Sequence, residues 1–244
     1  SNKAKGLFHK AISMSGYTTS ISPNEAYNPA NKSSTSNHSS FNVIKKLLES
    51  NEKYDGVDTE DHKKLRAILL SLTIDEFFIH YAKRSSYEEI PLLTADGITI
   101  PKVGLKKALG MKEYLNIVPT MAGSNRDEVK LWLATAEYFV ELDYSFLGSI
   151  LKIPKVKLKD EDSFEAFNYY RSSAWKIRGV DNPLKSLASV GNRNLYAYRY
   201  DWDDHRQFLI ADFKKLIGAA HATEIPLLAG DYKLVGGYPL SDLI

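Results

Sequence analysis

Apolar residues recur at helical spacing in the first half of the chain, from about residue 41 onward. Such spacing places apolar side chains on one face of a helix, where they can be buried together. The first stripe consists of Val43, Ile44, Leu47 and Leu48, and the second of Leu65, Ile68, Leu69 and Leu72. The pattern predicts two amphipathic helices in this region.

A helix start is encoded just after these stripes. Thr73 is followed three residues later by Glu76, which is the spacing of a capping box. In that motif the hydroxyl and the carboxylate satisfy the first free amides of a helix. We therefore expect a third helix, with Phe77, Phe78 and Tyr81 packing inward, and a helical layer over this part of the chain.

The segment SFEAFNYYRSSAWKIRG (163–179) predicts a further helix in the second half. Its apolar repeat comprises Phe164, Phe167, Tyr170 and Ala174. Lys176 and Arg178 stand where the negative end of the helix dipole favours basic side chains, and Gly179 is expected to end the helix.

Three other apolar segments have features of strands. KAISMSG (10–16) is a short apolar run that suits a buried strand, although such runs do not by themselves distinguish strand from helix. NIVPTMAGSN (116–125) predicts a buried strand and a turn, with a helix resuming at about Asp127, and NLYAYRYDW (194–202) alternates with period two. Because helices separate these strands, we predict an α/β fold with a largely parallel sheet.

One long polar stretch interrupts this pattern. Residues 18–40 are rich in Ser, Asn and Thr and offer little apolar surface. A chain segment of this kind cannot bury enough surface to order itself, so we predict a mobile surface loop or linker.

Composition narrows the classes of partner. The chain has 244 residues, 43% of them hydrophobic, which is enough for a sizeable core. Its 32 basic and 30 acidic residues leave a net charge of only +2, which argues against binding to nucleic acid or to an anionic membrane surface and favours small neutral partners. The absence of cysteine excludes disulfides and thiolate metal sites but leaves the cellular compartment open. We find no apolar run suited to a membrane span.

Two loops carry side chains suited to proton transfer. In open α/β sheets, reactive groups gather on the loops at the carboxyl ends of the strands. AGSNRDEV contains Asp127 and Glu128, and GAAHATEI contains His221. A carboxylate beside a histidine selects one imidazole tautomer and leaves the other nitrogen free to accept a proton from a nucleophile.

Several blocks, in one order, resemble the type B carboxylesterase and cholinesterase family of α/β-hydrolases. These blocks are KGLFHKAISMSG, GSNRDEVKLWL, NLYAYRYDWDD and GAAHATEIPLLAG, with LLTADGITIP similar to the block before the acid loop. The resemblance runs from Lys3 to about Gly230 and rests on the joint presence and order of the blocks. It implies a partial α/β-hydrolase domain over residues 1–244, truncated at both ends.

The resemblance also implies roles for three residues. Glu128 falls on the catalytic acid of the family's G-x-x-x-D-E stretch, and His221 falls on its catalytic base. Ser15 falls on a serine that supports the acid, so we expect it to hydrogen-bond Glu128. The family needs no metal and no cofactor for ester hydrolysis.

The nucleophile of that family is not found in this sequence. The family's serine lies in a G-x-S-x-G elbow upstream of the GLFH block, hence before Ser1, and no such motif occurs in the 244 residues. Ser15 lacks that setting and is a poor nucleophile candidate. We expect this chain alone to be inactive.

Each candidate also has an ordinary structural interpretation. Without the resemblance, His221 is better explained as a satisfied core or helix-start histidine, and Glu128 as a first-turn glutamate. Glu224 is more readily a first-turn helix carboxylate than a ligand, and DWDDHR (201–206) is better explained as a solvated loop than as a metal site. We expect the lysines of LKIPKVKLK (151–159) to decorate an exposed edge.

Two functional hypotheses follow. The first is the C-terminal part of a serine carboxylesterase, acting on a small-molecule ester. The second is a non-catalytic adhesion or binding protein on the same scaffold. In either case the uncovered apolar surface of a partial hydrolase predicts self-association or a complex with the missing N-terminal half.

Overall fold

The structure is a computed structural model that describes residues 2–27, 40–79, 93–143, 155–205 and 211–229. The chain divides into two compact units, each built from two separate stretches of sequence. The first unit comprises Ser1–Lys5 and Thr19–Leu115, and the second comprises Gly6–Thr18 and Asn116–Ile244.

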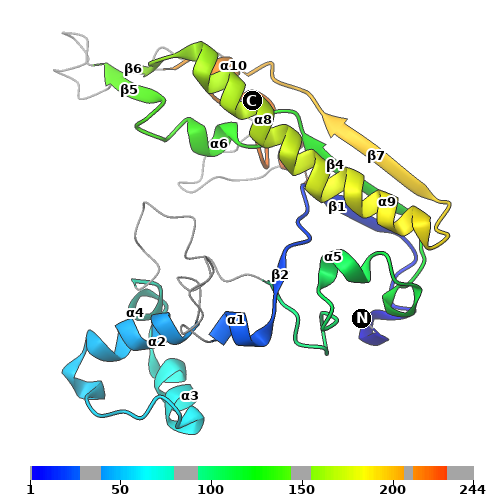
Figure 1. The fold of residues 1–244 in the computed structure, drawn as a ribbon. Coiled ribbons are helices and arrows are strands. Elements are labelled where there is room, and N and C mark those ends of the chain that lie inside the picture. The colour runs from blue at the N-terminus through cyan, green and yellow to red at the C-terminus, as the bar shows by residue number, and fades with distance from the viewer. Residues whose placement is uncertain (1, 28–39, 80–92, 144–154, 206–210, 230–244) are drawn as a thin grey trace. The chain divides into compact units, whose positions relative to one another are not determined.

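The first unit is mainly helical (Figure 1). Its helices are η1 (Asn2–Ala4), α1 (Pro23–Tyr27), α2 (Ser40–Glu49), η3 (Glu52–Tyr54), α3 (His62–Ser71), α4 (Ile74–Phe78), α5 (Leu105–Ala108) and η6 (Lys112–Tyr114). Strands β2 (Ser20–Ile21) and β3 (Leu93–Thr94) pair in parallel. Of the polar stretch 18–40, β2 and α1 are thus ordered elements, and residues 28–39 lie outside the described residues.

The two predicted stripes form the core of this unit. The cluster consists of Ile44, Leu47, Leu48, Tyr54 and Leu65, with Val57, Ile68 and Leu72 packed against it. The helical spacing in the sequence therefore reports burial correctly, because both helices turn one apolar face toward the other.

The capping box before α4 is present, but the helix that it starts is short. The hydroxyl of Thr73 accepts a hydrogen bond from the amide of Glu76, whose carboxylate accepts one from the amide of Thr73. The prediction that Phe78 packs inward is wrong, since its side chain is exposed, and Tyr81 lies outside the described residues. A helix of little more than one turn presents too small a face to bury consecutive aromatic rings.

A parallel sheet organises the second unit, as the sequence predicted. Strands β1 (Ala11–Met14), β4 (Thr120–Asn125) and β7 (Leu195–Tyr200) are all parallel, with β4 in the centre. A separate antiparallel pair consists of β5 (Val140–Asp143) and β6 (Lys155–Leu158), and Lys155 and Lys157 of β6 are exposed as expected. The remaining helices are α6 (Lys130–Leu133), α8 (Glu161–Lys176), the π-helix η7 (Ile177–Asp181), α9 (Asn182–Ser189), α10 (Phe213–Leu216) and α11 (Ile225–Ala229).

The strands of the sheet differ in burial. The last four residues of β4 are buried, whereas Ile12 and Met14 of the edge strand β1 are exposed. The expectation of a buried strand at 10–16 is therefore wrong for β1. An apolar run predicts the strand, but only its neighbours determine whether the strand is covered.

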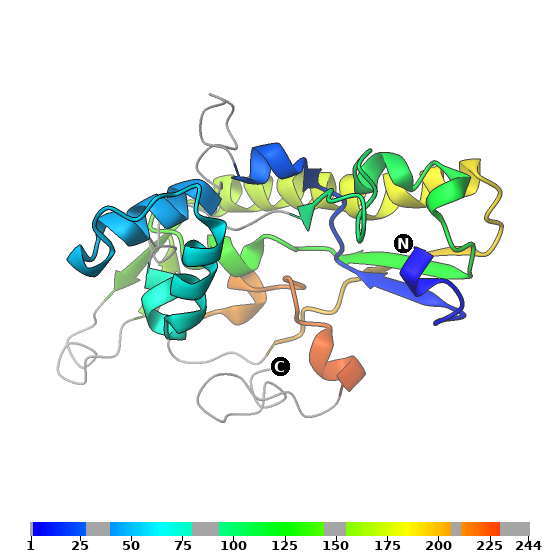
Figure 2. The same ribbon diagram turned by 90° about the horizontal axis from the view of Figure 1, so that it is seen from below.

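Helices α8 and α9 run along one face of the sheet (Figures 1 and 2). Gly179 does not end this helical run, because the chain continues through η7 into α9. A Cβ atom at Gly179 would stand 2.3 Å from the carbonyl oxygen of Gly16. The glycine is thus required for close contact between η7 and the end of β1, and not for a helix stop.

The buried face of α8 is partly polar. Phe164 is fully buried with Leu133 and Phe139, but the next buried residues along the helix are Asn168 and Ser172. Phe167 and Tyr170, members of the predicted apolar stripe, are exposed. The polar pair is buried because it hydrogen-bonds the loop that follows β4.

Candidate active site

The loop after β4 and the loop before α11 lie side by side at the carboxyl end of the sheet. Backbone hydrogen bonds join them: the amide of Asp127 donates to the carbonyl of Ala219, and the amide of His221 donates to the carbonyl of Glu128. The two loops in which we expected chemistry are thus brought together by the fold.

Glu128 is the most completely buried ionisable residue of this region, with none of its surface exposed. Its Oε1 accepts hydrogen bonds from the Ser15 hydroxyl at 2.5 Å and from the Asn125 amide at 2.7 Å. Its Oε2 lies 2.7 Å from Nδ1 of His221. A buried carboxylate with three donors has a single orientation available to it.

His221 is oriented by this carboxylate. Because a carboxylate only accepts, Nδ1 must carry the proton, which leaves Nε2 as the basic nitrogen. Nε2 has no hydrogen-bonding partner within the described residues, and about a third of the side chain, 32%, is exposed. The partly exposed ring therefore has one basic nitrogen that no hydrogen bond within the described residues occupies.

Ser15 supports Glu128 from the end of β1. Its backbone has a φ of 49°, in the left-handed region that non-glycine residues rarely adopt, and its amide donates to the carbonyl of Gly123. The expected hydrogen bond to Glu128 is present. Ala222, next to His221, also has a positive φ, of 71°. Unusual backbone conformations of this kind cluster at functional sites.

The electrostatics favour the charged form of His221. The hydrogen bond that His221 donates to Glu128 raises the pKa of His221, burial opposes this, and the negative charges of Glu128 and Glu224 raise the pKa further. The net shift is upward from the ordinary value of 6.5. The site thus stabilises an imidazolium, the species formed when a base accepts a proton.

We expect the Glu128→Gln variant to have a lower His221 pKa than the native chain, because the amide cannot stabilise the imidazolium by charge. A raised folded-state pKa contributes stability that is fully present below the unfolded value near 6.5 and is lost as pH rises through the folded value. The stability difference between native and variant chains should therefore shrink with rising pH across that window. Proton NMR of His221 and urea unfolding at several pH values measure both effects, and an unchanged His221 pKa would contradict this account.

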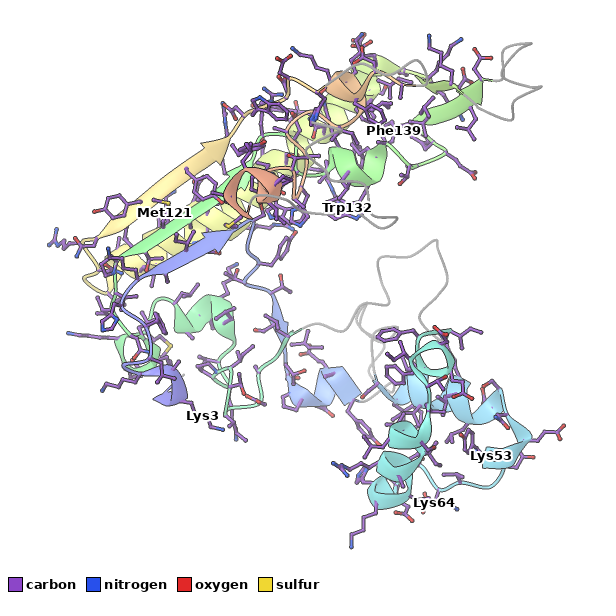
Figure 3. All side chains as sticks on the ribbon, turned by 180° about the vertical axis from the view of Figure 1, so that it is seen from behind. Lys3, Lys53, Lys64, Met121, Trp132 and Phe139 are labelled. Atoms are coloured by element: carbon purple, nitrogen blue, oxygen red, sulfur yellow. The ribbon has the colours of Figure 1, made fainter. Side chains whose placement is uncertain are left out.

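Two tryptophans that the sequence analysis did not single out pack against His221. The ring centroid of Trp132 on α6 lies 5.3 Å from that of His221, and the centroid of Trp175 on α8 lies 5.2 Å from it. Figure 3 labels Trp132 just past the carboxyl ends of the strands. No local motif marks either residue, so only their proximity in space identifies them.

Asp127, the neighbouring acid, has a different set of contacts from Glu128. Its carboxylate accepts hydrogen bonds from the Ala219 amide at 3.0 Å, from Asn168 at 2.8 Å and from Arg126 at 2.7 Å. Burial acts to raise the pKa of Asp127, but the hydrogen bonds from Arg126 and Asn168 outweigh it and lower the pKa. Of the two acids in this loop, Glu128 contacts His221 and Asp127 joins the loops to α8.

Two further expectations need correction. Glu224 stands immediately before α11 rather than in its first turn, and it is buried and accepts a hydrogen bond from the Asn125 side chain at 2.6 Å. In DWDDHR, His205 is also buried, because its Nε2 donates to the carbonyl of Gly218 at 2.5 Å, and Asp203 pairs with Arg126. These contacts help to place the histidine loop.

The described residues contain no cluster of three or more side chains suited to a metal ion. Within the same residues, no helix has the length and apolar character needed to cross a bilayer.

Comparison with known proteins identifies the fold. No protein-family model matches the sequence, and no curated protein matches it. Among solved structures, PNB esterase has a TM-score of 0.52 and 18% sequence identity, over 92% of this chain and 44% of its own. Carboxylesterase EST55 of Geobacillus stearothermophilus has a TM-score of 0.53 and 19% identity, over 92% of this chain and 42% of its own.

The chain therefore has a partial α/β-hydrolase fold, with a mostly parallel sheet. It spans less than half the length of these two esterases.

Proposed function

We propose that this chain is part of a serine carboxylesterase, in which Glu128 is the catalytic acid and His221 the general base. The observation that carries the proposal is the contact between Nδ1 of His221 and the fully buried carboxylate of Glu128 at 2.7 Å. This pair stands at the carboxyl end of a parallel sheet, where α/β enzymes bind their substrates. The order of acid before histidine agrees with that of the α/β-hydrolases.

The chemistry follows from the state of the two imidazole nitrogens. Nε2 of His221 accepts the proton of a serine hydroxyl as its oxygen attacks the ester carbonyl carbon, and then returns the proton to the departing alcohol. Water, deprotonated in the same way, then attacks the carbonyl carbon of the acyl-enzyme, and the proton returns to the serine oxygen as its bond to the acyl group breaks and the acid leaves. Glu128 keeps Nδ1 protonated and compensates the charge of the imidazolium. No step requires a metal or a cofactor.

We propose that the nucleophile belongs to a segment outside these 244 residues. Ser15 is unsuited to that role, because its hydroxyl donates to Glu128 and its contact is with the acid. No G-x-S-x-G motif is present in the sequence. The chain alone should therefore show no esterase turnover, while a protein that adds the elbow should be active.

The coding sequence immediately upstream of Ser1 provides the first test, and a G-x-S-x-G elbow there is the expected result. The protein that includes this segment should form a covalent adduct with a serine-reactive phosphonate, detected by mass spectrometry. Its His221→Gln variant should react far more slowly, because the nucleophile loses its base. An ordered protein with no elbow and no adduct would contradict the proposal and favour a binding protein on the same scaffold.

We also propose that the sheet of the second unit is covered by further protein, either the complementary part of the hydrolase or a second copy of this chain. Ile12, Met121 and Tyr196 are register partners on neighbouring strands, so they form one row across the sheet. Their exposed fractions are 67%, 37% and 56%. Parallel sheets are normally covered on both faces, and an apolar row of this kind is unfavourable in water.

Sedimentation velocity of the purified chain tests this proposal. We expect concentration-dependent association, and we expect Ile12→Lys to reduce it, because a charge in the row resists burial. Leu70→Lys, which changes an exposed leucine of the helical unit, is the matched control. A stable monomer over the full concentration range would contradict the proposal.

A further inference from the structure

Trp175 contacts both His221, the candidate base, and Ser15, which hydrogen-bonds the candidate acid Glu128. It lies on the last turn of α8, and its indole N–H donates to the backbone carbonyl of Ser15 at 3.2 Å. The same ring lies 5.2 Å from the imidazole of His221, at an interplanar angle of 39°. One side chain therefore joins the two segments that flank Glu128.

These contacts complete a closed ring of interactions. The Ser15 hydroxyl donates a hydrogen bond to one oxygen of Glu128, and Nδ1 of His221 donates one to the other oxygen. The imidazole of His221 packs on Trp175, whose N–H donates to the carbonyl of Ser15. Tyr17 packs edge-on against Trp175, with centroids 5.0 Å apart. This closed set of interactions joins β1, the loop after β4, α8 and the histidine loop, which are distant in sequence.

The hydrogen bond at Nδ1 sets the direction of that nitrogen, but the plane of the imidazole can still tilt about the line of the bond unless something packs against the ring. Trp175 and Trp132 provide that packing, and they also stack on each other with centroids 5.8 Å apart. The electron-rich face of an indole attracts a cation more strongly than it attracts a neutral ring. An imidazolium at 221 is therefore stabilised by the surface that limits its rotation.

We propose that Trp175 is a positioning residue, which holds the plane of His221 through its ring and the carbonyl of Ser15 through its N–H. The inference rests on the proposed function of His221 as a base. The two contacts of the indole have separate tasks: the ring orients the base, and the N–H keeps Ser15 in the left-handed conformation that directs its hydroxyl at Glu128.

Two substitutions separate these tasks in the 244-residue chain. Trp175→Leu removes the aromatic face and the N–H, whereas Trp175→Phe keeps a smaller aromatic face and removes the N–H. Trp202→Phe is the matched control, because Trp202 packs on His205 and, within the described residues, its ring makes no contact with that of His221. Glu128 and Glu224, whose charges act on His221, stay unchanged in every variant.

Proton NMR of His221 between pH 5 and 9 is the measurement. In Trp175→Leu we expect a lower His221 pKa and a downfield shift of its ring protons, since the cation loses the indole face and the ring current. In Trp175→Phe we expect both values to return most of the way to native, with faster solvent exchange of the Nδ1 proton. Trp202→Phe should match the native chain.

A folded Trp175→Leu chain with native His221 resonances and pKa would overturn the proposal. If that variant does not fold, Trp175→Phe decides, and native exchange of its Nδ1 proton would overturn the assignment of the N–H. These readouts need no turnover. A protein without phosphonate reactivity whose His221 still responds to Trp175 would therefore refute the esterase proposal and leave the positioning contact intact.

Discussion

Replacing Glu128 with alanine is expected to lower the free energy of unfolding of the second unit by about 3 kcal/mol. The native carboxylate is fully buried and satisfies the Ser15 hydroxyl, the Asn125 amide and Nδ1 of His221. Alanine leaves all three donors without an acceptor in a site from which water is largely excluded. An unsatisfied buried donor costs about 1–3 kcal/mol, and His221 recovers part of the loss by becoming neutral.

Urea unfolding followed by tryptophan fluorescence measures this effect, because Trp132 and Trp175 lie beside the site. Glu137→Ala is the control, since Glu137 is an exposed glutamate of the same unit, and it should change the stability by no more than about 0.5 kcal/mol. If both variants unfold at the same urea concentration, Glu128 does not hold the loops as described.

Replacing Asp127 with alanine is expected to have the second largest effect, a loss of about 2–3 kcal/mol. Asp127 is buried and connects the Ala219 amide, Asn168 of α8 and Arg126. Its removal leaves an amide of the histidine loop and a buried asparagine without their acceptor. Because Ala219 stands two residues before His221, the loss should also change the environment of that histidine.

Asp203→Ala is the matched comparison, because Asp203 binds the same Arg126 from a more exposed position. We expect it to cost less than about 1 kcal/mol, in line with partly exposed ion pairs. Urea unfolding gives the stability, and the NMR signals of His221 report on the loop. Equal losses of stability in the two variants would show that Asp127 stabilises the unit mainly through its ion pair with Arg126, and not by joining the loops.

Sequence patterns predicted the three strands of the parallel sheet and several of the helices, and the error in the buried face of α8 has a physical cause. The stripes at 43–48 and 65–72 became buried helix faces, and the segments at 10–16, 116–125 and 194–202 contain β1, β4 and β7. Helix 163–179 was predicted, but its buried face includes Asn168 and not Tyr170. A hydrophobic repeat assumes an apolar neighbour, and here the neighbour is the polar loop after β4.

The candidate site was predictable only as separate parts. The loop positions and the resemblance marked Glu128, His221 and Ser15, and the structure brings their polar atoms together. Their catalytic roles stay predictions. Trp175 was not marked by any pattern, because an aromatic residue in an amphipathic helix is ordinary until its neighbours are known.

The sequence by itself determined the helical stripes at 43–48 and 65–72, the three strands of the parallel sheet with helices between them, and which residues are suited to proton transfer. These properties depend on local periodicity, capping and side-chain chemistry. Only the tertiary structure decided that Glu128 contacts His221 while Asp127 binds the Ala219 amide, that Gly179 closely approaches Gly16, and that Trp175 packs on the imidazole. These contacts join residues far apart along the chain, and their geometry depends on packing that no local pattern records.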